Sequence, residues 1–509
     1  MVNHTSYIHT LETWTRSELE KKIIDSRLLS ISRRAAVYAY SFKDRTLIAK
    51  SYMPKEFKDY RQVKNSPALY NEVYNNSGNE EYRKELNLLK LLEETRTVPT
   101  VHAIVPELDM ILMSYEGEET FGDAFNKSKN ERKVDEEEIG RKVAEEETGR
   151  KRNEDERVIK ARVAKKFLDH LANFYFKSSK VNGEETRKLI SYIKADRKPN
   201  RYLRIREVEE EKNKLFGYIY RMIYGLSKEF QNDNLHLYQE IPTTPLERKK
   251  QWTKTKTLIR RYLDSKKINL PLLVKDLTED YMQLIYGTKK LNPDSKIKLL
   301  NSGRIRIIHG DYIPTNVIYI PLRYGAVLDL NECRFGAPTI DLASGLFNIY
   351  TQFSESRIPG LVEYFWNKEE NGIKKSAYSD YNNFLIANLT SRLIQNLRIS
   401  SSNSLYTAQE IERFVANHPE YKEISNLEKK KQLFQLERID DLKKMIPYYC
   451  FGDGKTQVLG NINPKTRDVF NHFLCTIHNL INNTFIISSS ELAELERYRG
   501  KSLSAITDK

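Results

Sequence analysis

Cysteine is scarce in this chain: three residues occur among 509, at Cys333, Cys450 and Cys475. An odd number at such wide spacings does not form the paired framework of a disulfide-stabilised protein, and no Cys-x-x-Cys metal motif occurs. Long apolar runs are also missing, because no stretch approaches the ~18 residues of a membrane helix. The N-terminal residues Met-Val-Asn-His-Thr lack the basic and apolar regions of a secretory signal. We therefore expect a cytoplasmic protein without a membrane partner.

The charge of the chain is not balanced, since 84 Lys and Arg stand against 70 Asp and Glu and give a net charge of +14. Such an excess favours a phosphate-bearing partner, either a nucleotide or a nucleic acid. Because the acidic and basic residues are interspersed, a lysine-rich protein with no such partner is the alternative. The 39% of hydrophobic residues suffices for a buried core, and the length allows two to four structural units.

The first 117 residues have the pattern of a small antiparallel sheet with one helix. Short polar links at 32–34 and 43–45 join apolar segments, as β-hairpins require. An amphipathic helix over 10–25 is expected to precede the sheet. The expected elements of the sheet region are three strands, one helix and two strands, over 27–32, 35–42, 46–52, 79–94, 98–106 and 109–115.

A lysine and a glutamate stand at apolar positions of this region. Lys50 lies among apolar residues of the third strand, and Glu85 shares the apolar face of the helix with Leu88, Leu89 and Leu92. An acid on an apolar face requires a cation, since a buried charge without a partner is strongly unfavourable. We expect Lys50 to be that cation. A surface lysine at a strand edge is the alternative.

The chain beyond residue 118 is charged and largely helical in pattern. Residues 124–157 contain a near-repeat, Glu-Glu-Glu-Ile-Gly-Arg-Lys and Glu-Glu-Glu-Thr-Gly-Arg-Lys, with hardly any apolar residues. Such a segment cannot bury a face, so we expect a solvated helix or a disordered insertion there. Helical patterns follow over 158–176, 203–230 and 254–263, and again over most of the chain after 341.

Residues 248–267 combine nine Lys or Arg residues with Trp252 and Tyr262. A basic stretch with aromatic side chains can bind single-stranded nucleic acid through charge and stacking. A solvated helix face explains the same pattern and is the favoured interpretation. Nucleic acid is therefore the less favoured partner.

The segment 307–320 holds the polar residues that are best placed for chemistry. His309, Asp311 and Asn316 lie between two apolar runs. A further apolar run begins soon after and ends in a carboxylate, Asp329. We expect this run to be a strand that brings its terminal acid close to the polar loop.

These residue types suit the transfer of a phosphoryl group. The reaction needs held phosphates, a placed metal charge and an oriented acceptor hydroxyl. Asn316 and Asp329 supply the oxygen ligands that Mg²⁺ prefers, and Asp311 is left to accept the proton of the hydroxyl. Lys50, paired with Glu85, is the candidate for holding the phosphates.

The order of these parts resembles the aminoglycoside phosphotransferase and choline kinase family of the protein kinase-like superfamily. The string His309-Gly310-Asp311-x4-Asn316 is similar to the His-Gly-Asp-x4-Asn catalytic loop of that family. From Asp329 onward the chain also matches the family pattern Asp-x6-Gly-x-Pro-x2-Asp-Leu-Ala at every constrained position. This second motif identifies the branch of the superfamily, whereas the catalytic-loop motif alone would be a weak signal.

The resemblance implies an α+β fold of the protein kinase-like, bilobal type. The N-lobe would span 1–117, with a small antiparallel sheet and one helix, and a large, mostly helical C-lobe would span 118–509. ATP and Mg²⁺ would be the cofactors, and the phosphate acceptor would be a hydroxyl of a small molecule. The motifs cover about 30–120 and 305–350, so the acceptor itself and the oligomeric state are left open.

The resemblance also implies roles for residues outside the catalytic loop. Met113 and Tyr115 would belong to the hinge that binds adenine. His309 and Asp341 would support the catalytic loop without binding a ligand.

One part of the chain departs from the family pattern. The turn that would cover the nucleotide, with Ser32 and Arg33, has no glycine, so its backbone N–H groups approach phosphate less readily. Arg33 would compensate by its charge. Two alternatives stay open: an atypical, RIO-like protein kinase, and a catalytically weak kinase-like module that contacts nucleic acid or protein through 248–267.

Overall fold

The computed structural model describes most of the chain up to residue 350. The described residues are 12–31, 35–52, 80–117, 119–126, 156–197, 203–226 and 245–350, with a few positions between 360 and 480. They belong to two compact units. The first holds the described residues of 1–205, 241–245 and 305–374, and the second holds those of 206–240, 246–304 and 375–509. All described residues of the candidate active site lie in the first unit.

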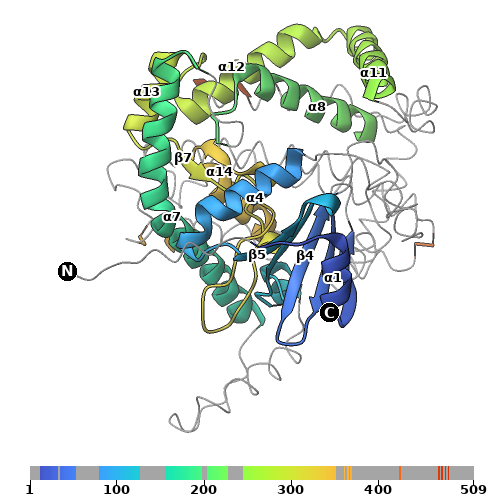
Figure 1. Cartoon of the computed structure of the whole chain (residues 1–509). Helices are drawn as coiled ribbons and strands as arrows, with labels where there is room; N and C mark the ends of the chain where they lie inside the picture. Colours follow the sequence, from blue (N-terminus) through green and yellow to red (C-terminus); the bar gives the residue numbers. More distant parts are fainter. Residues whose placement is uncertain are drawn as a thin grey trace, which may run out of the picture. The chain divides into compact units, whose positions relative to one another are not determined.

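A six-stranded sheet forms the N-terminal part of the first unit (Figure 1). Its strands are β1 (Glu12–Thr13), β2 (Asp25–Ile31), β3 (Ala35–Ser41), β4 (Thr46–Tyr52), β5 (Val101–Val105) and β6 (Met110–Ser114). Their order in space is β1-β5-β6-β4-β3-β2. Every neighbouring pair is antiparallel except β1 and β5, which are parallel. The five predicted strands are therefore present, and one short parallel strand extends the predicted antiparallel sheet.

Helices make up most of the remaining described chain. The first unit contains α1 (Arg16–Lys22), α4 (Glu80–Leu92), α5 (Phe121–Asn126), α7 (Glu156–Lys194) and α14 (Thr339–Tyr350). The second contains α8 (Val208–Leu226), α11 (Pro245–Ser265), α12 (Leu270–Tyr286) and α13 (Pro293–Asn301). The short elements are β7 (Arg306–Ile308), β8 (Arg334–Gly336) and four single-turn helices, η2 (Glu93–Thr95), η3 (Pro106–Leu108), η4 (Pro314–Asn316) and η5 (Leu330–Glu332). A sheet followed by a mainly helical remainder confirms the predicted α+β class.

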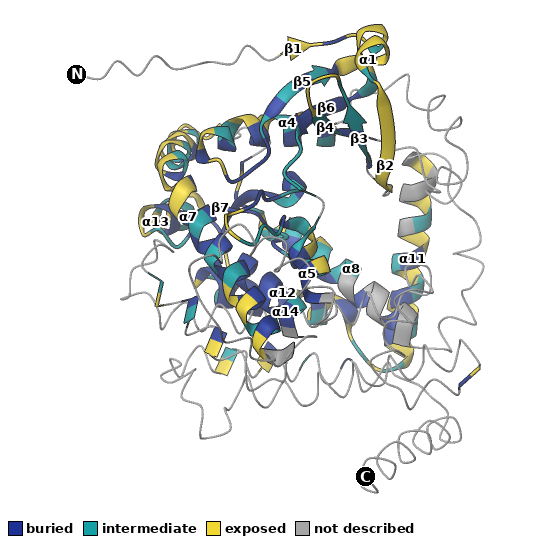
Figure 2. Ribbon diagram, turned by 90° about the horizontal axis from the view of Figure 1, so that it is seen from below, coloured by how far each residue is buried: buried dark blue, intermediate teal, exposed yellow. Residues whose placement is uncertain are grey.

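The alternation of side chains along β4 decides what faces α4. Successive side chains of a strand point to opposite faces of its sheet. Leu47 and Ala49 join a hydrophobic core that includes Trp14. Lys50 and Tyr52 meet α4, whose buried side chains include an acid among leucines. Strand β2, yellow in Figure 2, is an exposed edge of the sheet.

The predicted helix over 10–25 is too long. Helix α1 begins only after Thr15, whose hydroxyl accepts a hydrogen bond from the backbone N–H of Glu18 while the Glu18 carboxylate accepts one from the backbone N–H of Thr15. This reciprocal capping box fixes the start of the helix. Glu12 and Thr13 form the extended strand β1, and the backbone N–H of Trp14 donates to the Ile104 carbonyl at 2.9 Å.

Helix α7, by contrast, is longer than the predicted 158–176 and continues to Lys194. Its second half is polar, and Lys188 pairs with Glu184 and Glu185 at 2.8 Å. Pairs at spacings of three and four support a helix where apolar residues are sparse, so the apolar pattern underestimated its length, although Leu189 is still buried.

The second unit contains two of the predicted helices, as α8 and α11. Helix α8 packs against α12. The basic stretch 248–267 lies largely on α11, which buries Thr255, Ile259 and Leu263 on one side. Most of the charged repeat in 124–157, and most of the chain after 350, lie outside the described residues.

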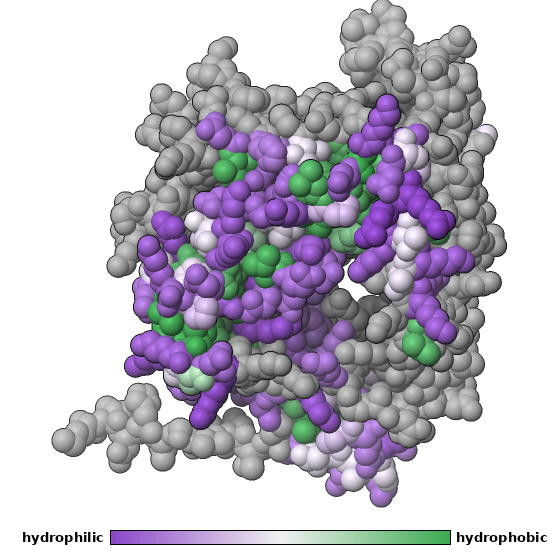
Figure 3. Space-filling model, turned by 90° about the horizontal axis from the view of Figure 1, so that it is seen from above, coloured by the Kyte–Doolittle hydropathy of each residue, from purple (hydrophilic) through white to green (hydrophobic). Residues whose placement is uncertain are grey.

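Hydrophilic side chains cover most of the described surface in the view of Figure 3, and hydrophobic ones gather there in small separate groups. None of the described helices is both long and apolar enough to cross a membrane.

Candidate active site

Three segments that are distant in the chain meet at the side chain of Lys50. Its ammonium group donates hydrogen bonds to both carboxylate oxygens of Glu85, at 2.6 and 3.0 Å, and to Oδ1 of Asp329 at 3.2 Å. The Tyr52 hydroxyl also donates to Glu85. Lys50 is only 9% exposed, so it is not the surface lysine of the alternative interpretation.

The charges of this cluster stabilise one another. Burial acts to lower the pKa of Lys50, but the carboxylates of Glu85 and Asp329 outweigh it and raise that pKa. Burial likewise acts to raise the pKa of Asp329, but the charge of Lys50 outweighs it and lowers that pKa. Lys50 and Asp329 therefore both stay ionised near neutral pH.

Asp329 does not lie at the end of a strand, contrary to the prediction. Its φ of +57° is in the left-handed region, which Asp tolerates better than most residues. The run before it forms a single bridge, between Val327 and Val317. Asn331 donates its amide to Asp329 Oδ1 at 2.8 Å. The left-handed turn ends the extended run early and directs the carboxylate toward Lys50.

Asn316 and Asp329 lie at the two ends of one hairpin, which we call hairpin 316–329. The backbone N–H of Leu328 donates to the Asn316 carbonyl at 2.8 Å, and that of Ile318 donates to Ala326 at 2.9 Å. The two predicted metal ligands are thus brought together by short-range pairing, although 12 residues lie between them.

A buried carboxylate, Asp341 at the start of α14, holds the loop that contains Asp311. It accepts the backbone N–H of His309 at 2.8 Å, that of Gly310 at 2.7 Å and the hydroxyl of Tyr175 at 3.1 Å. Asp341 is fully buried, and this burial raises its pKa. A buried carboxylate that accepts three hydrogen bonds, two of them from the loop backbone, fixes the loop.

Gly310 and His309 complete the support of this loop. Gly310 has a φ of +83°, and a Cβ there would collide with the carbonyl oxygen of Glu332. The Nε2 of His309 donates to the Leu328 carbonyl at 2.8 Å, while its Nδ1 accepts the backbone N–H of Asp311. His309 therefore connects the catalytic-loop candidate to the residue before Asp329.

A comparison with family models shows to which family the chain belongs. The model of the phosphotransferase enzyme family matches residues 73–370, which is more than half of the chain. The chain belongs to the phosphotransferase enzyme family. The matched range includes Glu85, Asp311, Asn316 and Asp329, and the match confirms the resemblance to phosphotransferases found in the sequence.

Solved structures of kinases are similar to this phosphotransferase only at low identity. A choline kinase from Cryptosporidium parvum is 9% identical, with 84% of this chain and 91% of that chain covered and a TM-score of 0.37. An ADP-bound aminoglycoside phosphotransferase, APH(2'')-Ib, is 12% identical, with 79% and 94% covered and a TM-score of 0.35. A microcompartment-associated aminopropanol kinase is 12% identical, with 82% and 93% covered and a TM-score of 0.35. With TM-scores below 0.5, these similarities add nothing to the family assignment. A comparison with curated proteins finds none that matches the chain.

The chain that follows the hinge candidates of the phosphotransferase pairs with hairpin 316–329. Met113 is buried on β6, opposite Ile48 of β4, and Tyr115 follows the end of the strand. The chain after Tyr115 then pairs with the hairpin, because Tyr319 donates its backbone N–H to Glu119 at 2.8 Å. Ser32 and Arg33 lie outside the described residues.

Several residues that shape the site of this phosphotransferase were not predicted. Tyr52 could have been found, because it lies two residues after Lys50 and so shares its face of the strand. Tyr175 and His170 lie on α7, far from the loop in sequence. His170 accepts the Tyr312 hydroxyl at 3.0 Å and donates to the Gly325 carbonyl at 2.7 Å. No spacing rule connects such partners.

The side-chain oxygens of Asn316 and Asp329 suit a cation whose other ligands are phosphate oxygens and water. Among the described residues, no group of three or more His, Cys, Asp or Glu side chains forms a metal site by itself. Asn316 donates its amide nitrogen to the Asp311 carbonyl at 3.0 Å, which leaves Oδ1 as the amide atom suited to a cation. The Asp329 side chain is 46% exposed. Two protein oxygens, completed by phosphate and water, fit the coordination of Mg²⁺.

Proposed function

We propose that this phosphotransferase moves the γ-phosphate of ATP to a hydroxyl of a small molecule, such as a sugar, an amino alcohol or an aminoglycoside-like compound. The observation that supports the proposal most is the position of Lys50 between Glu85 and Asp329. Phosphoryl transfer depends on positioning and on charge rather than on covalent chemistry. A lysine held by two carboxylates is a fixed cation for the α- and β-phosphates.

Asp311 is the proposed base. It lies half-buried in the loop that Asp341 holds, and it accepts the proton of the acceptor hydroxyl as negative charge develops on that oxygen. Asn316 and Asp329 hold Mg²⁺. When bound, Mg²⁺ neutralises charge on the phosphates.

The remaining assignments belong to the same proposal. Met113 and Tyr115 contact adenine, and Ser32 and Arg33 cover the phosphates. The N-lobe ends near 117, and the helical C-lobe contributes the acceptor pocket. The cytoplasmic location stays a prediction from the sequence.

Incubation of the purified protein with Mg-ATP and a broad panel of hydroxyl-bearing metabolites tests the proposal. We expect ADP to form together with a product whose mass is that of one metabolite plus one phosphate group. Label that appears on protein and on no metabolite would favour the RIO-like alternative. Absence of both nucleotide binding and turnover, with salt-sensitive binding of RNA or DNA, would favour the binding module.

A further inference from the structure

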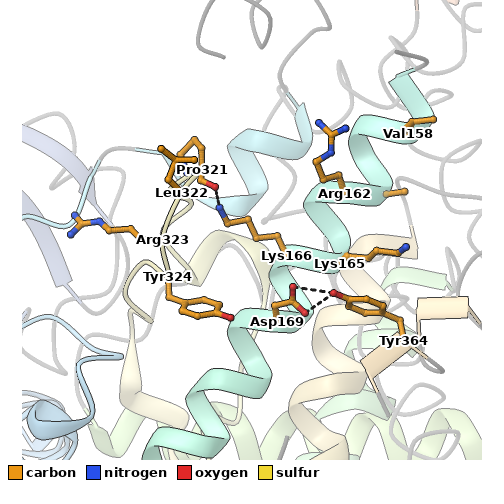
Figure 4. A pocket seen from close by; sticks show the side chains of 11 residues that line it. Val158, Arg162, Lys165, Lys166, Asp169, Pro321, Leu322, Arg323, Tyr324 and Tyr364 are labelled. Carbon is orange, nitrogen blue, oxygen red and sulfur yellow. Dashed lines mark hydrogen bonds between the residues drawn. The ribbon is translucent and has the colours of Figure 1, made fainter. Parts of the chain in front are cut away.

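A cavity of about 660 Å³ lies between the N-terminal half of α7 and the tip of hairpin 316–329 (Figure 4). Its volume falls within the ~300–1,000 Å³ of small-molecule sites. None of the residues assigned to the nucleotide, the metal or the base lines it. The cavity is therefore separate from the residues proposed for the reaction.

The helical wall of this cavity is basic. Arg162, Lys165 and Lys166 line it from one face of α7, at spacings of three and four residues. Arg323 adds a fourth cation from the tip of the hairpin, where its side chain extends away from the helix (Figure 4). Asp169 is the one acid that lines the cavity.

That acid is already engaged with other groups. The Tyr364 hydroxyl donates to the Asp169 carboxylate at 2.8 and 3.0 Å, and Lys368 pairs with it at 2.8 Å. Lys368 offsets the charge of Asp169, so this acid does not cancel the positive charge of the lining. The residues that line the cavity include four cations and one acid, and their net charge is positive.

The wall is also held in place. Lys166 donates to the carbonyl oxygens of Ile320, at 2.5 Å, and Pro321, which fixes the tip of the hairpin against α7. The ammonium of Lys165 lies 5.2 Å from the ring centre of Tyr364, a cation–π contact that restrains it. Charges that are positioned in advance bind an anion with little loss of conformational entropy.

Apolar and aromatic groups complete the lining. Val158 and Leu322 are exposed, and so is Tyr324, at 47%. Exposed apolar side chains next to cations suit a ligand with a charged end and an apolar or aromatic body. A phosphate monoester has such an end, because it is close to dianionic at neutral pH and forms strong bonds with Arg.

We propose that this cavity binds a small phosphate monoester with an aromatic or apolar body, at a site separate from the nucleotide. The test uses 2-naphthyl phosphate as the probe and isothermal titration calorimetry on the full chain. We expect saturable binding of the probe and no binding of 2-naphthol, which has the same body without the charge. Equal binding of the two compounds would overturn the proposal.

Variants then locate the bound probe. Arg162→Gln and Lys165→Gln should each weaken binding about tenfold, because each removes a charge-assisted contact. Asp169→Asn should tighten it, since the acid is lost and Lys368 keeps its charge. Lys180→Gln, an exposed lysine of α7 outside the cavity, is the matched control and should change nothing. Binding that is the same in Arg162→Gln, Lys165→Gln and the wild type would contradict the site.

A competition experiment separates this site from the nucleotide site. Excess ADP with Mg²⁺ should not displace 2-naphthyl phosphate. Displacement by ADP would overturn the proposal, because the probe would then occupy the nucleotide site. The thermal midpoint of every variant shows that it is folded, and Lys165→Arg, which keeps the charge, should restore binding.

Discussion

Lys50 on β4 lies 3.2 Å from Asp329, although 279 residues separate the two in the chain. The same ammonium group donates to Glu85 on α4. Without the cation, two carboxylates this close would repel each other, and a buried one would be strongly unfavourable. The contact therefore connects the sheet, α4 and hairpin 316–329. For this reason we propose Lys50 for the phosphates and Asp329 for the metal.

The first prediction concerns the proposed base. Asp311→Asn should lower kcat by about 10²–10⁴-fold, because an amide cannot accept the proton of the acceptor hydroxyl. The affinity for ATP should stay unchanged, since Lys50 and Asp329 are intact. Steady-state kinetics and nucleotide titration measure the two effects. The control is Asp44→Asn, which removes an exposed acid of the 43–45 link. Equal turnover in the wild type and in Asp311→Asn would show that Asp311 is not the base.

The second prediction concerns the metal. Asp329→Asn keeps the shape of the side chain and tolerates the left-handed backbone at φ +57°, which Ala would not. It removes the charge that we propose for Mg²⁺ binding, so the increase in nucleotide affinity caused by Mg²⁺ should disappear while metal-free binding persists. Titrations of ADP with and without Mg²⁺ measure this difference. An undiminished Mg²⁺ effect in the variant would place the ion elsewhere.

Much of the sheet region and the main charged residues could be predicted from the sequence. The strands of the sheet are marked by short polar links, and β4 agrees with the predicted 46–52 at both ends. Lys50 and Glu85 each stand out as a charge in an apolar pattern, so their pairing follows from the cost of burying a charge alone. The loop at 309–316 could be predicted from the spacing of His309, Asp311 and Asn316 between two apolar runs.

The parts that were missed depend on contacts between distant segments. Tyr175 reaches Asp341 across 166 residues, and His170 reaches Tyr312 across 142. Both residues look like ordinary members of an amphipathic helix. The left-handed conformation of Asp329 likewise has no sequence signal, because an apolar run that ends in an acid is typical of a strand.

The third prediction concerns Gly310, whose φ of +83° and lack of a Cβ allow the loop to approach Glu332. Gly310→Ala should lower the free energy of unfolding by about 2 kcal/mol or more, through strain and collision. Gly183→Ala on α7 is the matched control, because nothing lies within 4 Å of its Cβ position; it should stabilise by ~0.5–1 kcal/mol. Urea unfolding measures both. A Gly310→Ala variant as stable as the wild type would contradict the close approach.

The fourth prediction concerns the pH dependence of stability. His170 is buried between Tyr312 and Gly325, and this burial lowers its pKa from 6.5 to about 4. In the unfolded chain the His170 imidazole therefore binds a proton below pH ~6.5. In the folded chain it does so only near pH 4. Stability contributed by the neutral imidazole is complete above pH ~6.5 and falls as the pH drops, by about 3 kcal/mol in total.

A variant isolates this contribution from that of the other titrating groups. His170→Gln retains an acceptor for the Tyr312 hydroxyl and a donor for the Gly325 carbonyl, but it does not titrate. We expect the wild type to lose about 2 kcal/mol more than the variant between pH 7 and pH 5, because 1.5 pH units lie below the unfolded pKa. Urea unfolding at both pH values gives the double difference. Equal losses of stability in the two proteins would mean that His170 becomes protonated without unfolding. A neutral His170 would then not connect Tyr312 of the 309–316 loop to Gly325 of hairpin 316–329.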